Sequence, residues 1–467
     1  MSDAPAPAAP GALRGDLTQG PLLRTLMLFA LPQLVGNVLQ SLNGSINAIW
    51  VGQLLGDGAL AATANANIIM FLLFALVFGF GMAATVKIGQ AWGRKDISAA
   101  RRALGTALGL TGGIALVTTV GGMVFAPQLL DLLATPGDAR AEALAYLRVV
   151  FIANPMATIT TMIAMGLRGA GDAATPLRFL ILTVVLDVVL NPLLILGFGP
   201  VPALGIAGSA WATVIATTVG LIGLIGWIYA KDLPLRLRGS ELRWLKPHHA
   251  ELQFILAKGL PMGAQMLIIS GAGVIMIGLV NREGIVMAAA YGALLQVWNY
   301  IGMPAMAIGG AVSAMVAQHI GAAREERVDA IGWAGSLANL AMTGALIAVL
   351  VPFDRPVLEL FLGHDSPAVP AALHIQDLAI WTYLPFGITI VLFGTLRAYG
   401  VIYAQLAVLL ASMYAARLGA YWLLYPALGP DALWYSLLIS SVLSMVLTVA
   451  IYFHAPWRKL MLARIAQ

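Results

Sequence analysis

The sequence predicts an all-α, polytopic membrane protein with about twelve transmembrane helices in two parallel six-helix repeats around a central cleft. Three observations predict this fold class: a very apolar composition, apolar runs long enough to cross a bilayer, and a match between the two halves of the chain. Of the 467 residues, 60% are hydrophobic and only 10% are charged. A soluble protein carries roughly 25% charged residues, so most of this surface must contact lipid.

The predicted spans follow one another along the whole chain. A helix needs about 20 mostly apolar residues to cross the hydrocarbon core. The connections between such runs are short, and Gly is abundant, as expected where membrane helices pack closely. The spans are centred near Val38, Phe71, Ala115, Thr158, Leu186, Ala216, Ser270, Trp298, Leu340, Ile388, Leu410 and Val442.

The charges of the connections predict the orientation in the membrane. Counting from the turn at Gly56, the even-numbered connections hold most Lys and Arg residues, such as Arg94 and Arg324, whereas the odd-numbered ones are mainly acidic or neutral. The positive-inside rule then places both termini in the cytoplasm, which agrees with an even number of spans. We expect cytoplasmic tails at 1–20 and 456–467. The first is expected to be disordered, because it is rich in Ala and Pro and lacks the apolar core of a signal peptide.

The two halves of the chain are related by an internal repeat. Residues of the first half recur at an offset of 228 or 229: Leu31–Pro32 as Leu260–Pro261, Gln90 as Gln318, and Arg168 as Arg397. Because the offset covers six spans, both repeats enter the membrane from the same side. The predicted domains are an N-terminal bundle (21–230), a cytoplasmic linker (231–252) and a C-terminal bundle (253–455). Such bundles can rock about a cleft and give alternating access, and duplication for structural reasons alone is the alternative.

Asp187 is the first candidate for a functional group, because it lies in the fifth predicted span. An ionisable residue at the bilayer centre costs about 2.5–3.5 kcal/mol and therefore indicates function. Asn191 follows four residues later on the same helix face, and Pro192 leaves a backbone carbonyl one turn earlier without its usual donor. A carboxylate, an amide and a free carbonyl suit a small cation or a proton. The alternative is a structural carboxylate bonded to neighbouring helices.

Other polar side chains are candidates for lining a substrate cleft. Gln40, Asn43 and Asn47 share one face of the first span, and that face must contact protein or water. Arg417 in the eleventh span is the repeat counterpart of the Asp187 region and would balance an acidic group across the cleft. The alternatives are interhelical hydrogen bonds for the amides and snorkelling to the interface for Arg417.

Trp298 and Gln265 are weaker candidates for the same cleft. Trp298 and its Met and Tyr neighbours could bind an amphipathic cation, although ordinary helix packing is the preferred interpretation.

No P-loop, HExxH motif or nucleophile–base pair is present in the sequence. Cysteine is absent and the six histidines are scattered, so we expect neither an enzyme nor a metal site. Without a nucleotide site, transport would be driven by an ion gradient or a partner. The net charge of +5 belongs to the connections, so nucleic acid is not an expected partner.

Several motifs resemble those of one family of transporters. The most specific is Arg-Gly-Ala-Gly-Asp-Ala-Ala-Thr-Pro at 168–176, and shorter ones lie at 46–52, 89–93, 190–192 and 205–213. Over 22–453 the sequence resembles the MATE (multidrug and toxic compound extrusion) family. The resemblance implies a secondary active multidrug efflux antiporter that exchanges amphipathic, cationic organic compounds for protons or sodium by alternating access. It further implies a monomer in the bacterial inner membrane that needs no cofactor.

The resemblance also implies an ion-coupling site, which maps by motif onto Asn47, Asn154, Asp187, Asn191 and Thr213. The sequence departs from the family pattern at three places. Asn47 stands where Asp is usual, Asp187 precedes Asn191 instead of following it, and the seventh span has Gln265 but no glutamate. A single buried carboxylate favours proton exchange, because sodium sites gather more negative charge and more oxygen ligands.

Two other functions are compatible with twelve spans. A flippase for lipids or lipid-linked oligosaccharides would need several basic residues in the cleft, and the sequence offers Arg417. A non-transporting scaffold or sensor would need neither the Asp187–Asn191 pair nor an occluded polar pocket.

Overall fold

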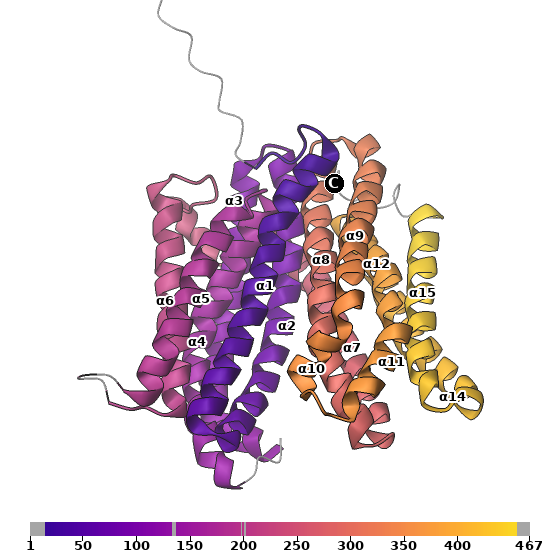
Figure 1. Cartoon of the computed structure of the whole chain (residues 1–467). Helices are drawn as coiled ribbons and strands as arrows, with labels where there is room; N and C mark the ends of the chain where they lie inside the picture. The colour runs from indigo at the N-terminus through magenta and orange to yellow at the C-terminus, as the bar shows by residue number, and fades with distance from the viewer. Residues whose placement is uncertain (1–14, 133–136, 198, 200–201, 455–467) are drawn as a thin grey trace, which may run out of the picture.

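The computed structural model describes residues 15–132, 137–197, 199 and 202–454, and it consists of two helical halves that lie side by side (Figure 1). The N-terminal half contains α1 (Leu22–Leu55), α2 (Asp57–Gly93), α3 (Ile97–Leu132), α4 (Gly137–Gly169), α5 (Ala174–Leu196) and α6 (Ile206–Ala230). The C-terminal half contains α7 (His249–Arg282), α8 (Ile285–Gly321), α9 (Val328–Leu350), α10 (Asp354–Leu362), α11 (Ala368–Ala379), α12 (Tyr383–Ala398), α13 (Tyr403–Leu409), the π-helix η5 (Leu410–Ala416), α14 (Arg417–Leu428) and α15 (Ala432–Phe453).

The described part of the chain crosses the membrane region twelve times. Eleven continuous helical stretches are long and apolar enough to span a bilayer, and the last of them, Tyr403–Phe453, has 51 residues. As one helix it would be about 77 Å long, far more than the roughly 30 Å hydrocarbon core. The chain instead reverses at Gly429, whose φ is 57°, so this stretch supplies two spans. The predicted fold class is confirmed.

The two halves pack against each other through glycines that allow close backbone contact. A Cβ on Gly79 would overlap backbone atoms of Gly259 and Gly263 on α7. A Cβ on Gly93 would overlap the Gln318 carbonyl on α8, and one on Gly321 would overlap the Gln90 carbonyl on α2. The last two contacts are equivalent under the sequence repeat, so α2 and α8 meet through a pair of matching surfaces.

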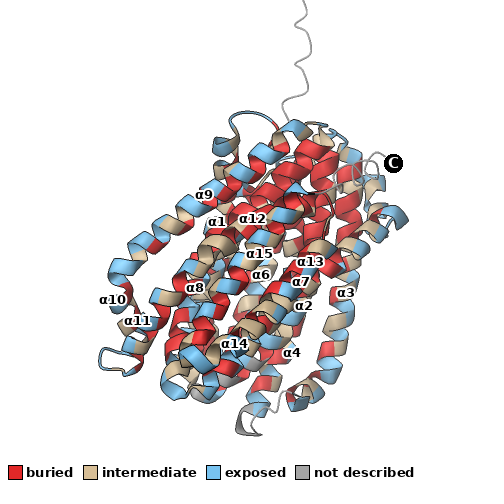
Figure 2. Cartoon of the chain, turned by 90° about the vertical axis from the view of Figure 1, so that its right-hand side faces the viewer, coloured by how far each residue is buried: buried red, intermediate tan, exposed pale blue. Residues whose placement is uncertain are grey.

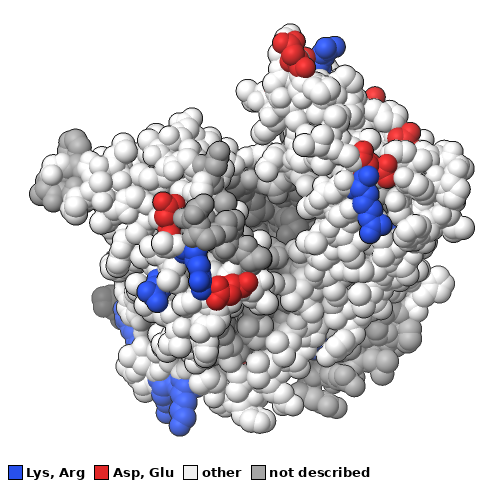
Figure 3. Space-filling model, turned by 90° about the horizontal axis from the view of Figure 1, so that it is seen from below, with Lys and Arg blue, Asp and Glu red and all other residues white. Residues whose placement is uncertain are grey.

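The contact between the halves is concentrated at one end of the molecule. The C-terminal part of α8, from Met303 to Ile320, is almost entirely buried. Figure 2 shows that buried residues are densest toward this end, where α1 begins and α15 ends. Seen from the opposite end, the surface is hollowed between the two halves (Figure 3). The molecule is therefore closed at the end where α1 begins and α15 ends, and open at the other.

Residues 15–20 correct one expectation from the sequence. The first 14 residues and 455–467 lie outside the described residues, but Gly15–Gly20 are not disordered. Leu17 is 5% exposed, and its backbone N–H donates to Gln318 Oε1 at 2.9 Å. Arg324 and Arg327 donate to the Thr18 carbonyl at 2.9 and 3.1 Å. The composition of the segment gave no sign of these partners, because they lie more than 300 positions away.

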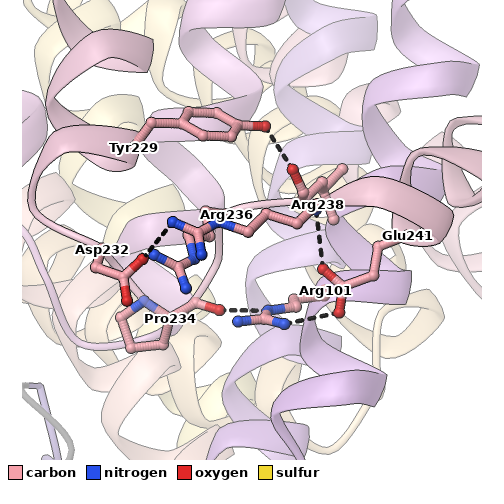
Figure 4. Close-up of polar contacts among 8 residues, drawn as sticks. Arg101, Tyr229, Asp232, Pro234, Arg236, Arg238 and Glu241 are labelled. Atoms are coloured by element: carbon pink, nitrogen blue, oxygen red, sulfur yellow. Dashed lines mark hydrogen bonds and ion pairs between the residues drawn. The ribbon is translucent and has the colours of Figure 1, made fainter.

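The segment between α6 and α7 is folded onto α3. It contains the 3₁₀ helix η1 (Gly239–Leu245). Arg101 on α3 donates to the Pro234 carbonyl at 2.6 Å and to Glu241 Oε1 at 2.7 Å (Figure 4). Burial by itself would raise the pKa of Glu241, but the Arg238 backbone N–H and the Arg101 guanidinium outweigh it, so the pKa lies below its usual value. The connection between the halves is thus anchored to the N-terminal half.

Candidate functional site

Asp187 lies inside the N-terminal half, where three helices meet. Its side chain is 1% exposed. Oδ2 accepts hydrogen bonds from Asn43 Nδ2 at 2.9 Å and Asn47 Nδ2 at 2.7 Å, both on α1. Oδ1 accepts one from Thr213 Oγ1 on α6 at 3.0 Å. Asn191 is fully buried, and its Nδ2 donates to Asn47 Oδ1 at 3.1 Å. These five residues form what we call the Asp187 cluster.

The sequence dictates this arrangement through spacing and small residues. Asn43 and Asn47 are four positions apart on α1, as Asp187 and Asn191 are on α5, so each pair projects from one helix face. Glycines bring α6 onto α5, because a Cβ on Gly208 or Gly220 would overlap Leu194 or Thr183 of α5. Thr213 lies between these two glycines on α6 and is thereby held against the carboxylate.

The Asp187 cluster also contains acceptor atoms without donors. Asn43 Oδ1 and Asn191 Oδ1 are buried and have no hydrogen-bond partner among the described residues. Which atom of an amide is oxygen is inferred from the hydrogen-bond network, and here one atom of each amide stays unpaired. A carboxylate, a hydroxyl and two unpaired amide oxygens form a set that can hold a proton or a small hard cation.

The structure places one predicted coupling residue elsewhere. Asn154 on α4 donates from Nδ2 to the Ala115 carbonyl at 3.3 Å and to the hydroxyls of Thr118 and Thr119 at 3.0 and 3.4 Å. All three partners are on α3, so Asn154 joins α3 to α4 and is not hydrogen-bonded to the Asp187 cluster. Asn43, which the sequence suggested as a cleft residue, is instead hydrogen-bonded to the carboxylate of Asp187.

The residues suggested for the substrate cleft have different environments. Gln40 is exposed. Gln265 is 8% exposed and donates to Gln405 Oε1 at 2.9 Å, and Trp298 is 4% exposed and donates from Nε1 to Gln376 Oε1 at 2.6 Å. Both are therefore hydrogen-bonded inside the C-terminal half. Arg417 is also buried there and does not face an acidic group across the cleft.

One polar contact between the halves was not predicted from the sequence. Asn299 Nδ2 on α8 donates to Ser41 Oγ on α1 at 3.0 Å. Ser41 lies within the polar stretch from Gln40 to Asn47, and the amide residues Gln296 and Asn299 interrupt the apolar eighth span. These two amides in an otherwise apolar span were the sequence signal that could have predicted the contact. The contact joins the helix that carries Asn43 and Asn47 to the other half of the molecule.

Comparisons with known proteins agree with this architecture. The MatE family profile matches the chain twice, at residues 32–193 and 261–422. The probable multidrug resistance protein YoeA of Bacillus subtilis is 31% identical over 446 residues, which cover 95% of this chain and 96% of YoeA. YpnP, also a probable multidrug resistance protein of Bacillus subtilis, is 30% identical over 449 residues, which cover 96% of this chain and 98% of YpnP.

The solved structures show the same fold. One described as the outward-facing conformation of a multidrug resistance MATE family transporter of the MOP superfamily has a TM-score of 0.86 at 20% identity. The match covers 98% of this chain and 100% of that chain. The doubled profile match follows the internal repeat, and the family consists of transporters, not enzymes. The chain belongs to the MATE (multidrug and toxic compound extrusion) family and is a multi-pass membrane protein.

Proposed function

We propose that this chain is a secondary active efflux antiporter that exchanges amphipathic organic compounds, cationic ones among them, for protons by alternating access. The observation that carries the proposal is the Asp187 cluster, in which one buried carboxylate is held by α1, α5 and α6. The relatives named for multidrug resistance support small organic compounds as the exported class. They favour export of such compounds over flipping of lipids or lipid-linked oligosaccharides.

The hydrogen bonds of Asp187 suggest how proton binding would move a helix. Oδ2 already accepts from two amide N–H groups, which cannot accept in return, whereas the Thr213 hydroxyl at Oδ1 can donate or accept. A proton on Oδ2 would point at the amide donors of Asn43 and Asn47, so one of these bonds must break or the carboxyl must turn. Because α1 also contacts α8 through Ser41 and Asn299, release of α1 would change the contact between the halves.

We further propose the arrangement in the membrane. The basic connections support a cytoplasmic position for the closed end and for both termini, and the hollow in Figure 3 would then face outward. The moving bodies would be the bundles 21–230 and 253–455, joined by the linker 231–252. We propose a monomer in the bacterial inner membrane, since each chain contains both bundles.

Sodium is the second candidate for the coupling ion. The unpaired oxygens Asn43 Oδ1 and Asn191 Oδ1 favour it, because together with Asp187 and Thr213 they offer oxygen ligands of the kind that hard cations prefer. A proton needs the carboxylate alone. The two candidates therefore differ in which gradient drives transport.

Purified protein in vesicles, given one gradient at a time, distinguishes the two candidates. Ethidium is the transported probe. We expect it to accumulate in vesicles with an acidic lumen, since protons leave as the dye enters, and we expect a protonophore to abolish the accumulation. Accumulation of ethidium in vesicles that contain a high sodium concentration, without a pH difference, would identify sodium as the coupling ion in place of the proton. No accumulation of ethidium with either gradient would contradict the proposed exchange.

Two asparagine substitutions test which amide belongs to the coupling site. Asn47→Ala removes one hydrogen bond to the carboxylate and one to Asn191, and a hydrogen bond to a charged group contributes about 1.5–3 kcal/mol. We expect gradient-driven ethidium uptake to fall about tenfold. Asn154→Ala, the matched control, removes bonds to α3 and should lower thermal stability while leaving the response to the gradient intact. Equal loss of coupling in both variants would show that position 154 also belongs to the coupling site.

A further inference from the structure

Arg417 is a buried charge that the proposed proton exchange does not use. It opens α14 and is 7% exposed. Its Nε donates to Ser440 Oγ on α15 at 3.0 Å, and its two terminal nitrogens donate to no described residue. The groups that interact with it electrostatically are the hydroxyls of Tyr291, Tyr383 and Tyr414, and no carboxylate is among them. A guanidinium at membrane depth is normally paired, so this one has donors available for a ligand.

The surroundings of Arg417 are aromatic. Tyr291 packs edge-on against Trp298 with ring centroids 5.9 Å apart, and Trp298 lies 6.1 Å from Tyr383. Tyr291 also lies 5.6 Å from Trp434 on α15. These four rings come from α8, α12 and α15 and form what we call the aromatic cluster. Tyr291, Trp298 and Trp434 are packed in the core, and Tyr383 at the edge of the cluster is partly exposed. A flat organic ring system can pack against that edge, where phenol hydroxyls and the guanidinium supply hydrogen-bond donors.

The local backbone sets Arg417 apart from the rest of the span. The seven residues before it, Leu410–Ala416, form a π-helix, a conformation that is rare and occurs often at functional sites. Tyr414 belongs to this segment, and its hydroxyl donates to the Ile268 carbonyl of α7 at 2.8 Å, so the same irregular turns anchor the span to α7 and present the guanidinium. An uninterrupted α-helix would rotate the two side chains relative to each other.

The internal repeat relates Arg417 to the Asp187 region of the first half. Subtracting 229 from 417 gives 188, next to Asp187 on α5. In the first half a hydroxyl from the last helix, Thr213 of α6, bonds the acid, and in the second half a hydroxyl from the last helix, Ser440 of α15, bonds the base. The two halves thus carry opposite charges at related places. Asp187 accepts hydrogen bonds from side chains of its own half, whereas no carboxylate of the described residues interacts with Arg417.

We propose that Arg417 binds the acidic group, a carboxylate or phosphate, of the transported amphipathic compound, and that the aromatic cluster binds its ring system. Guanidinium forms paired hydrogen bonds with such anions, and a site poor in water strengthens them. The inference rests on the proposed export function and narrows its substrate class. Compounds that carry an acidic group, zwitterions included, bind more tightly than compounds with a positive charge alone.

Rhodamine B and its ethyl ester test the proposal, because they share the ring system and differ in a free carboxylate. Binding to purified protein in lipid nanodiscs is measured by fluorescence without any ion gradient. The unaltered protein is expected to bind rhodamine B about tenfold more tightly than the ester. Arg417→Gln is expected to remove this preference and to leave binding of the ester unchanged within about twofold. Arg417→Lys keeps the charge and should retain part of the preference.

Arg282→Gln is the matched control, since Arg282 is exposed at the end of α7, and it should change neither affinity. Equal affinity of the unaltered protein for both dyes, undetectable binding of rhodamine B, or equal weakening of both dyes by Arg417→Gln would overturn the proposal. Size-exclusion profiles of the variants check their folding. Carboxylate-dependent binding without gradient-driven exchange in vesicles would overturn the antiport function but leave this site intact.

Discussion

Replacing Asp187 with Asn is expected to abolish gradient-driven efflux while the protein still folds and inserts. The substitution conserves volume, so the packing of α5 against α1 and α6 is preserved. The amide cannot take up a proton, although its oxygen can still accept from Asn43 and Asn47 and its NH₂ group can donate to the Thr213 hydroxyl, so the hydrogen bonds of the site are kept. We expect uptake of ethidium into vesicles with an imposed gradient to fall about 100-fold, which corresponds to about 2.7 kcal/mol.

Asp377→Asn is the control for this prediction. Asp377 lies on α11 and is exposed, so loss of its charge should leave transport unchanged. Retention of full gradient-driven uptake by Asp187→Asn would show that another group binds the coupling ion. A variant that no longer purified as a single species would point to a structural carboxylate, the alternative that the sequence left open.

Most of the fold could be predicted from the sequence because membrane insertion imposes simple local requirements. A span needs a certain length of apolar residues, and this requirement identified the twelve crossings, including the two in Tyr403–Phe453. The Asp187 cluster was predictable in part for a similar reason. Spacings of four residues on α1 and α5 define a shared polar face, and such faces must be buried against each other or against water.

The site was predictable only in part, because a sequence pattern shows the face a residue occupies but not the helix opposite that face. The family resemblance assigned Asn154 to the ion site, and nothing in the sequence indicated that its side chain donates to the hydroxyls of Thr118 and Thr119. Gln265 was a candidate for the cleft, whereas its side chain donates to Gln405 within its own half. These partners are distant in the sequence. Without coordinates, nothing distinguishes a cleft amide from one that bonds inside a bundle.

The closed end of the molecule leads to a second prediction with a large effect. Gly93→Val is expected to shift the protein away from the closed arrangement, because the added side chain would overlap the Gln318 backbone carbonyl. Overpacking of this kind costs about 1–3 kcal/mol, and about 2 kcal/mol changes the ratio of two states roughly 30-fold. Gly321→Val should have the same effect, since Gly321 meets the Gln90 carbonyl in the repeat-related contact. Transport should fall in both variants, because alternating access requires both states.

A single cysteine can report this shift, since the chain contains none. Ala317→Cys introduces a thiol at a fully buried position of α8 that faces Gly89 of α2. We expect a maleimide to label it slowly in the otherwise unaltered protein and about tenfold or more faster when Gly93→Val is added. Gly113→Val, at an exposed α3 glycine with open space around it, should leave the labelling rate unchanged. If Gly93→Val also left that rate unchanged while transport was lost, the contact between α2 and α8 would not open during the cycle. Access to the cleft would then have to alternate between the two sides of the membrane through a movement within each bundle. The moving part would be α1 with its contacts to Asp187.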